Sequence, residues 1–135
     1  DDNLVEAIKK AERLTAPASG KEPLLTLVVF LSYSGKWDIL QAAKRMAKEY
    51  ADDPAGLESV GIEDFDRYLA TAGIPDPDLI IRTSGEERIS NYMLWQTAYT
   101  EFVFTDTLWP DFRRDEYLAA LEEYASRDRR FGKVK

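Results

Sequence analysis

Apolar and polar positions divide the chain into alternating helical and extended segments. Apolar side chains recur at helical spacing in five stretches, which we predict to be helices: residues 2–14, 37–50, 62–73, 89–99 and 115–126. Three short runs rich in Val, Leu, Ile and Phe indicate strands at residues 24–31, 79–83 and 101–106. The first run, LLTLVVFL, is apolar at seven of its eight positions, so we expect that strand to be covered on both faces.

The alternation of strands with helices predicts an α/β fold, a three-layer, mostly parallel sheet with helices on both faces. With 135 residues the chain fits a single domain, residues 1–135. Only three strands are evident, and sheets usually hold about four to six. One explanation is a small three-layer domain with an unrecognised strand. The one we favour is that a further strand and its helix lie outside this chain.

Composition excludes several classes of function. Acidic residues outnumber basic ones by 25 to 18, a net charge of −7, which argues against nucleic acid as a partner. The chain has neither cysteine nor histidine, so thiolate nucleophiles, imidazole bases and Cys/His metal sites are excluded. Oxygen ligands remain for any metal, which favours Mg²⁺. A chain without cysteine is compatible with the cytoplasm.

Charge gathers between a predicted strand and a predicted helix, in DLIIRTSGEERISNYMLWQ, residues 78–96. Arg82 stands at the carboxyl end of the strand, where parallel sheets bind ligands, and Arg88 follows on the loop. Ser90 fits the N-cap of the next helix, whose first N–H groups would attract an anion. Two guanidinium groups and a helix N-terminus suit a phosphate or diphosphate.

A purely structural interpretation of this cluster is equally open. Arg82 could form an ion pair with Asp78, Glu86 or Glu87, and Ser90 could be an ordinary cap. The chain has no Walker loop and no G-x-G-x-x-G sequence, so a nucleotide is not indicated. Glu101, at the start of the third strand, could share a Mg²⁺ ion with a bound diphosphate, or it could be a solvated charge.

The segment DLIIRTSGEERISNYMLWQTAYTEFVFTDTLWPDF closely resembles the signature region of the cis-prenyltransferases, the undecaprenyl diphosphate synthase family. The upstream LSYSGKWDILQAAKRMA and the terminal RDRRFG fit the same family in the same order. The resemblance implies an enzyme that joins isopentenyl diphosphate to an allylic diphosphate, commonly farnesyl diphosphate, with Mg²⁺ as cofactor. The usual bacterial product is undecaprenyl diphosphate, the lipid carrier for cell-wall precursors.

The same resemblance assigns roles to individual residues. Diphosphate binding falls to Arg82, Arg88, Ser90, Arg130 and Gly132, Mg²⁺ binding to Glu101, and orientation of the arginines to Glu86. Arg130 and Gly132 form an R-x-G sequence that in the family reaches the neighbouring subunit, so a homodimer is implied. A cytoplasmic location, and peripheral membrane association through the lipid product, are implied as well.

The sequence departs from the family pattern in two places. The D-G-N-G-R-W-type motif, which carries the catalytic Asp and grips the allylic diphosphate, has no match, so this chain contains no catalytic residue. S-Y-S-G, residues 32–35, stands where N-Y-G-G is usual, a minor difference that we expect to be tolerated. We interpret the chain as the C-terminal part of the fold, the isopentenyl-diphosphate half of the site, with the N-terminal strand and helices missing, and expect it to be inactive alone. Two alternatives are a non-catalytic subunit of a two-component prenyltransferase and an unrelated anion-binding α/β module.

Overall fold

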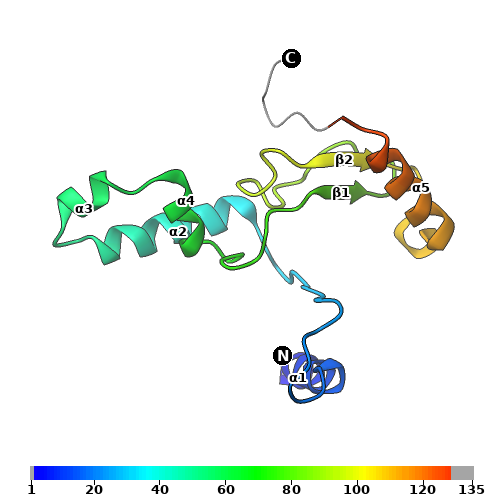
Figure 1. Ribbon diagram of the computed structural model, residues 1–135, viewed down its shortest axis with the longest axis horizontal. Coiled ribbons are helices and arrows are strands. Elements are labelled where there is room, and N and C mark those ends of the chain that lie inside the picture. The colour runs from blue at the N-terminus through cyan, green and yellow to red at the C-terminus, as the bar shows by residue number, and fades with distance from the viewer. Residues whose placement is uncertain (1, 129–135) are drawn as a thin grey trace. The chain divides into compact units, whose positions relative to one another are not determined.

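A computed structural model of the protein describes residues 2–128. The chain divides into two compact units, Asp1–Leu31 and Ser32–Lys135, and each is described by itself. Figure 1 labels the helices and strands of both. That the whole chain forms one domain stays a prediction.

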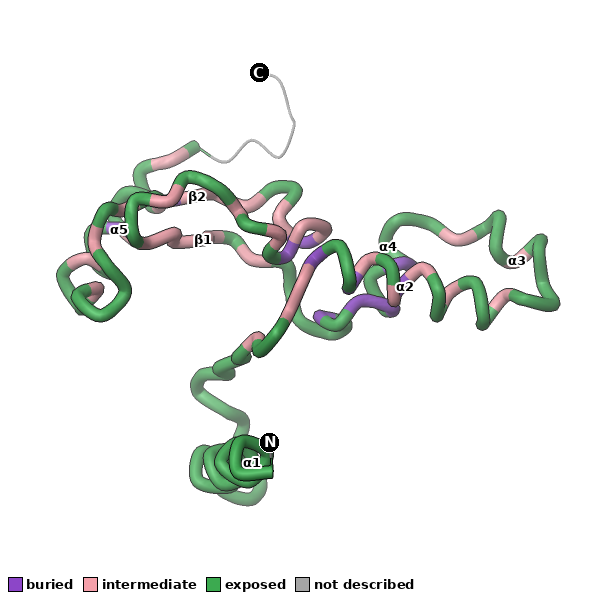
Figure 2. The backbone as a smooth tube through the Cα atoms, turned by 180° about the vertical axis from the view of Figure 1, so that it is seen from behind, coloured by how far each residue is buried: buried purple, intermediate pink, exposed green. Residues whose placement is uncertain are grey.

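The first unit begins with helix α1, Asp2–Thr15, which confirms the helix predicted over residues 2–14. The predicted strand at residues 24–31 is wrong. These residues form irregular chain, in which Leu24, Leu25 and Leu27 are largely exposed (Figure 2). A strand needs backbone hydrogen bonds to a neighbour and cover for its apolar side chains. Within residues 2–128 the strands present pair only with each other, so this run has neither.

The second unit begins with helix α2, Gly35–Glu49, close to the predicted 37–50. The Oγ of Ser34 caps this helix by accepting the Trp37 N–H at 3.4 Å. The apolar face of α2 forms the core of this unit together with the segment that follows it. The buried members of this core are Ala42, Phe65, Tyr68 and Leu69, and Ile39, Ala43, Met46, Tyr50 and Trp95 pack around them.

Two short helices lie between residues 51 and 73. Helix α3, Pro54–Glu58, forms between the predicted helices 37–50 and 62–73, where we expected neither a helix nor a strand, and Asp53 caps it through the Gly56 N–H at 2.9 Å. Helix α4, Ile62–Phe65, passes directly into a 3-10 turn, η1, Asp66–Tyr68. The predicted helix over residues 62–73 is therefore only half right. Its second half is instead tied to α2, where the Arg45 guanidinium and the Asp38 carboxylate bond backbone groups of this segment.

Strands β1, Leu79–Arg82, and β2, Glu101–Phe104, pair in parallel, as predicted. The register sets Leu79 opposite Glu101 and Arg82 opposite Phe104. Helix α5, Arg114–Ala125, matches the predicted 115–126 and contacts β2, with Ala120 buried on its inner face. A 3-10 turn, η2, Trp109–Asp111, leads into it. The strand and helix periodicities thus predicted β1, β2, α2 and α5 correctly.

The helix predicted at residues 89–99 is wrong: the segment is a succession of turns. Ser90, Asn91 and Met93 have φ values of 49°, 61° and 46°. An L-residue pays about 1–2 kcal/mol to adopt that left-handed conformation, and three of them within four positions cannot continue a right-handed helix. Met93 and Gln96 are buried all the same, so the segment packs inward without being helical. In the described residues 2–128, no helix has both the length and the apolarity of a bilayer span.

Gly35 allows the turns of residues 89–99 to approach the first turn of α2. A Cβ at this position would lie 2.8 Å from Leu94 Cγ, 3.0 Å from the Leu94 nitrogen and 3.2 Å from the Asn91 carbonyl oxygen. The first of these is closer than real Cβ contacts come, and two of the three atoms belong to the backbone. The close approach therefore depends on glycine.

We expect Gly35→Ala to lower the free energy of unfolding by about 1–3 kcal/mol, the usual cost of overpacking. Chemical denaturation followed by circular dichroism measures the loss. Gly61→Ala is the matched control, because a Cβ there meets only the Asp64 Oδ2 at an ordinary 3.5 Å. Equal losses for the two variants would contradict the close-approach argument.

Candidate anion-binding site

The site lies at the carboxyl end of the β1–β2 pair, where the backbone is held by hydrogen bonds beyond the strands. The Thr105 N–H donates to the Arg82 carbonyl at 2.9 Å. In the opposite direction, the Ser84 N–H donates to the Thr107 carbonyl and the Gly85 N–H to the Thr105 carbonyl, both at 3.0 Å. The segment after β1 is therefore fixed to the segment after β2 before it turns away.

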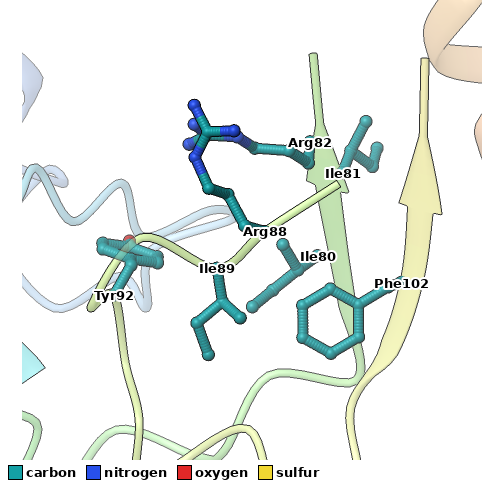
Figure 3. A pocket seen from close by; sticks show the side chains of 7 residues that line it. All are labelled: Ile80, Ile81, Arg82, Arg88, Ile89, Tyr92 and Phe102. Carbon is teal, nitrogen blue, oxygen red and sulfur yellow. The ribbon is translucent and has the colours of Figure 1, made fainter. Parts of the chain in front are cut away.

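A cavity of about 230 Å³ opens beside this end of β1. Its lining is Ile80, Ile81, Arg82, Arg88, Ile89, Tyr92 and Phe102. Figure 3 shows the guanidinium groups of Arg82 and Arg88 reaching toward one another, with Ile80, Ile89 and Phe102 below them. The cavity is smaller than the ~300–1,000 Å³ typical of pockets for drug-sized ligands. One end of the cavity is thus cationic and the other walls are apolar. Its size and lining suit a small anion that carries an apolar group.

Arg82 is half-buried, and its Nε–H is buried with no hydrogen-bond partner among the described residues. Burying an unsatisfied donor of this kind costs about 1–3 kcal/mol, more when the group is charged. A second guanidinium lines the same cavity, which adds like-charge repulsion. Both costs disappear when an anion with several acceptor oxygens lies between the two groups.

Arg88 is more exposed, with 69% of its side-chain surface accessible, and forms an ion pair with Glu86. The sequence also allowed an ion pair between Glu86 and Arg82, but in the structure Glu86 pairs with Arg88. The pair is largely solvated, and such pairs contribute only about 0–1 kcal/mol. An incoming anion can thus compete for Arg88 at little cost.

The segment between β1 and the turns is strained. We define the arginine loop as residues 83–93, and in it Ser84, Gly85, Ser90, Asn91 and Met93 all have positive φ. Non-glycine residues in this region cost of order 1–3 kcal/mol each and persist where the surroundings enforce them. Because the predicted helix does not form, Ser90 caps no helix, which corrects the cap expected from sequence. Ser90 is exposed on the same loop as Arg88.

Contacts that sequence reasoning missed hold the far end of the arginine loop to α2. The Asn91 side chain accepts from the Lys36 N–H at 2.9 Å and donates to the Ser34 Oγ at 2.7 Å. The Asn91 carbonyl accepts from the Gly35 N–H at 2.7 Å. The partners lie more than fifty residues apart in sequence, so no local pattern reveals these bonds. An asparagine directly after a predicted cap was the one available signal.

The buried carboxylate of Asp38 also links the arginine loop to α2. Asp38 on α2 is fully buried and accepts from the Ala70 N–H at 2.8 Å and the Tyr33 hydroxyl at 3.0 Å. The Tyr33 ring in turn meets the Tyr92 ring edge-on, with centroids 5.7 Å apart. A charged residue within the apolar stripe of the predicted helix could have indicated Asp38. The cavity wall at Tyr92 is thereby linked to the α2 core.

Glu101 is half-buried at the start of β2 and pairs with Arg127, whose Nη1 lies 2.8 Å from the Glu101 Oε2. Arg127 also pairs with Glu123 one turn earlier. Within residues 2–128, no three acidic side chains gather as a metal centre built from protein alone would require. A single carboxylate fits a Mg²⁺ ion that takes its other ligands from phosphate oxygens and water. The remaining predicted site residues, Arg130 and Gly132, lie outside the described part of the chain.

The fold and the site define a class: α/β proteins with an arginine-lined cavity at the carboxyl ends of parallel strands. The chain belongs to the prenyltransferase family of undecaprenyl diphosphate synthases, whose family profile matches residues 1–132. The predicted α/β class, with helices around a parallel sheet, is confirmed by the strand pairing and by the structural likeness described next.

Similar proteins carry related names. An isoprenyl transferase of Porphyromonas gingivalis is 50% identical over 133 residues, 98% of this chain and 51% of that protein. A farnesyl-diphosphate-specific ditrans,polycis-undecaprenyl-diphosphate synthase of Coxiella burnetii is 46% identical over 98% of this chain and 54% of its own length. The crystal structure of lavandulyl diphosphate synthase from Lavandula x intermedia, in complex with dimethylallyl diphosphate, matches with a TM-score of 0.85. It is 35% identical over 98% of this chain and 56% of that one. The chain thus spans about half the length of the curated relatives it matches.

The half-buried hydroxyl of Tyr33 predicts a pH dependence of stability. Burial, reinforced by the hydrogen bond to Asp38, raises the pKa of Tyr33 from 10.0 to about 12. The protonated form is favoured in the folded state, so this contribution to stability is complete below pH 10 and is lost as the pH rises through 12. We expect the free energy of unfolding to fall between about pH 10 and about pH 12, and to fall less steeply in Tyr33→Phe. Urea denaturation at several alkaline pH values measures both slopes, and identical slopes would refute the role given to Tyr33.

Proposed function

We propose that the cavity binds the diphosphate of isopentenyl diphosphate and that the whole protein is a cis-prenyltransferase. The observation that carries the proposal is the convergence of the Arg82 and Arg88 guanidinium groups on one cavity, with a buried Nε–H of Arg82 left unpaired. Guanidinium forks match phosphate oxygens two at a time. The apolar walls at Ile80, Ile89 and Phe102 suit the five-carbon chain that isopentenyl diphosphate carries.

The second substrate in this proposal is an allylic diphosphate, with farnesyl diphosphate the candidate that the relatives' names support. Its carbon–oxygen bond breaks, and the diphosphate leaves with the electron pair. The alkene of isopentenyl diphosphate attacks the allylic carbon, and a diphosphate oxygen takes the proton whose loss restores a double bond. Stabilising the departing charge is the main task, which fixed cationic groups perform well. No thiol or imidazole is needed, in keeping with a chain that has neither.

We assign Mg²⁺ to Glu101 together with diphosphate oxygens, with Arg127 giving up its hold on the carboxylate in exchange. When bound, the ion would neutralise charge on the diphosphate. Glu86, through its ion pair with Arg88, keeps that guanidinium near the cavity until the substrate takes its place. Ser90, on the same loop, is proposed as a further donor to the diphosphate, and Arg130 and Gly132 as donors contributed across a homodimer.

The segment TEFVFTDTLWPDF, residues 100–112, is the proposed dimer interface. Leu108 and Trp109 keep 57% and 71% of their surface exposed, and the Trp109 and Phe112 rings stack with centroids 6.2 Å apart. Exposed aromatic residues of this kind are enriched at the centres of protein interfaces. The products proposed are long polyprenyl diphosphates such as undecaprenyl diphosphate.

We expect Arg82→Ala to weaken binding of isopentenyl diphosphate to the chain by about 10- to 100-fold, because each charge-assisted hydrogen bond contributes roughly 1.5–3 kcal/mol. Isothermal titration calorimetry on the purified 135-residue chain measures the dissociation constant. In the complete enzyme, the same substitution should raise the Michaelis constant for this substrate.

The matched control is Arg114→Ala, which removes the same charge from an exposed position on α5 outside the cavity lining. We expect it to bind isopentenyl diphosphate like the unaltered chain. Equal dissociation constants for the Arg82 variant and the unaltered chain would rule out the assignment of the cavity.

A further inference from the structure

The arginine loop is held at both ends, and its second anchor has no role in the function proposed above. At the first end, Ser84 and Gly85 are bonded to the segment after β2. At the second end, Asn91 is bonded to three successive residues at the start of α2. Arg88 lies between the two anchors. Its position relative to Arg82 therefore depends on both.

We propose that Asn91 and Ser34 are positioning residues: their hydrogen bond clamps the arginine loop to helix α2 and so holds Arg88 opposite Arg82. The inference rests on the proposed function, because it assigns to these two residues the preorganisation of the diphosphate site. Neither residue lines the cavity, so they act through the loop and not on the ligand.

The orientation of the Asn91 amide follows from its partners. The Lys36 N–H can only donate, so the atom 2.9 Å from it is the amide oxygen. The amide nitrogen then faces the Ser34 Oγ at 2.7 Å, and the hydroxyl accepts. Each polar atom of the side chain thus has one defined partner. The geometry would be lost with either an apolar residue at position 91 or the loss of the hydroxyl at position 34.

These bonds also occupy the N-terminus of α2. Gly35 and Lys36 are its first two residues, and their N–H groups have no partner inside the helix. The Asn91 carbonyl and amide oxygens accept from both. The helix end therefore serves as an anchor for the loop, and its dipole is directed at Asn91 and not at a bound anion.

Helix α2 is itself held in place by packing, so it can fix the position of the loop bonded to it. It runs for 15 residues and packs its apolar face into the core of the second unit. The loop by itself is strained at Ser90 and Asn91, so without the anchor these residues would relax toward ordinary backbone angles. Arg88 would then sample many positions. Ligand binding would be weaker, because ordering Arg88 in the complex costs conformational entropy.

The test is titration of sodium pyrophosphate into the full 135-residue chain, followed by calorimetry. Asn91→Gly keeps the left-handed backbone accessible and removes only the side chain. We expect its dissociation constant to rise about tenfold, and that of Ser34→Ala about fivefold, the effect of roughly one or more hydrogen bonds. Ser34→Thr, which keeps the hydroxyl, should bind pyrophosphate like the unaltered chain.

Two further variants separate positioning from general destabilisation. Asp53→Ala removes the cap of α3 and lowers stability by a comparable amount, yet should leave the dissociation constant unchanged. In an Arg88→Ala background, Asn91→Gly should cost little additional affinity, because the group that Asn91 positions is already absent. Undiminished binding by Asn91→Gly, or a full further loss in the Arg88→Ala background, would overturn the inference.

Hydrogen exchange keeps the inference testable apart from the proposed function. If the unaltered chain fails to bind pyrophosphate, the proposed function fails. Slow exchange of the Gly35 and Lys36 amides, abolished in the Lys36 case by Asn91→Gly, would show that the clamp exists regardless of the ligand. Rapid exchange of the Lys36 amide in the unaltered chain would contradict the clamp itself.

Discussion

The parallel pairing of β1 with β2 is the interaction on which the site depends. Its register places Arg82 opposite Phe104, and the hydrogen bonds continue past the strands through Ser84 and Gly85. Gly85 has a φ of 65°, and a Cβ there would lie 3.0 Å from the Asp106 Oδ1. Both facts favour glycine over other residues at this position. Were the register to slip by one residue, Arg82 would move to the opposite face of the sheet. The cationic end of the cavity follows directly from this alignment.

Charge at the site is distributed so that a ligand can replace protein contacts. Arg82 has a buried Nε–H with no partner among the described residues, whereas Arg88 is paired with Glu86 in an exposed position. The first group favours any anion that reaches it, and the second gives up a weak ion pair to join it. Glu101 is in a comparable situation, since Arg127 occupies the carboxylate that we assign to Mg²⁺. Arg88 and Glu101 are thus each held by an ion pair within the protein, which the diphosphate and the Mg²⁺ of our proposal would have to replace.

The sequence was sufficient to predict those helices and strands whose apolar periodicity matches the face that they bury. Strands β1 and β2 and helices α2 and α5 formed close to the predicted bounds, and Arg82 and Arg88 met in one cavity. The prediction at residues 24–31 was wrong because strand formation requires a neighbour, which composition cannot supply. The helix predicted at residues 89–99 was wrong because its turns are imposed from outside, by bonds between Asn91 and the start of α2.

The same distinction applies to the site. Ser34 departs from the family motif and looked like a tolerable replacement, yet its hydroxyl both caps α2 and receives the Asn91 amide. Asp38 lies within the helix predicted at residues 37–50, and Tyr33 lies within S-Y-S-G, and neither pattern indicates their contacts with Ala70 and Tyr92. Such long-range bonds between polar side chains follow no periodicity. Sequence patterns therefore identified the arginines that line the cavity more readily than the residues that hold their loop in place.

A crystal structure of the chain soaked with isopentenyl diphosphate tests the central claim most directly. The account predicts one diphosphate between the two arginines, with the Arg82 Nε–H and the Arg88 guanidinium each within hydrogen-bonding distance of its oxygens and the five-carbon chain against Ile80 and Phe102. A diphosphate bound elsewhere, or one held by Arg82 while Arg88 keeps its contact with Glu86, would contradict it.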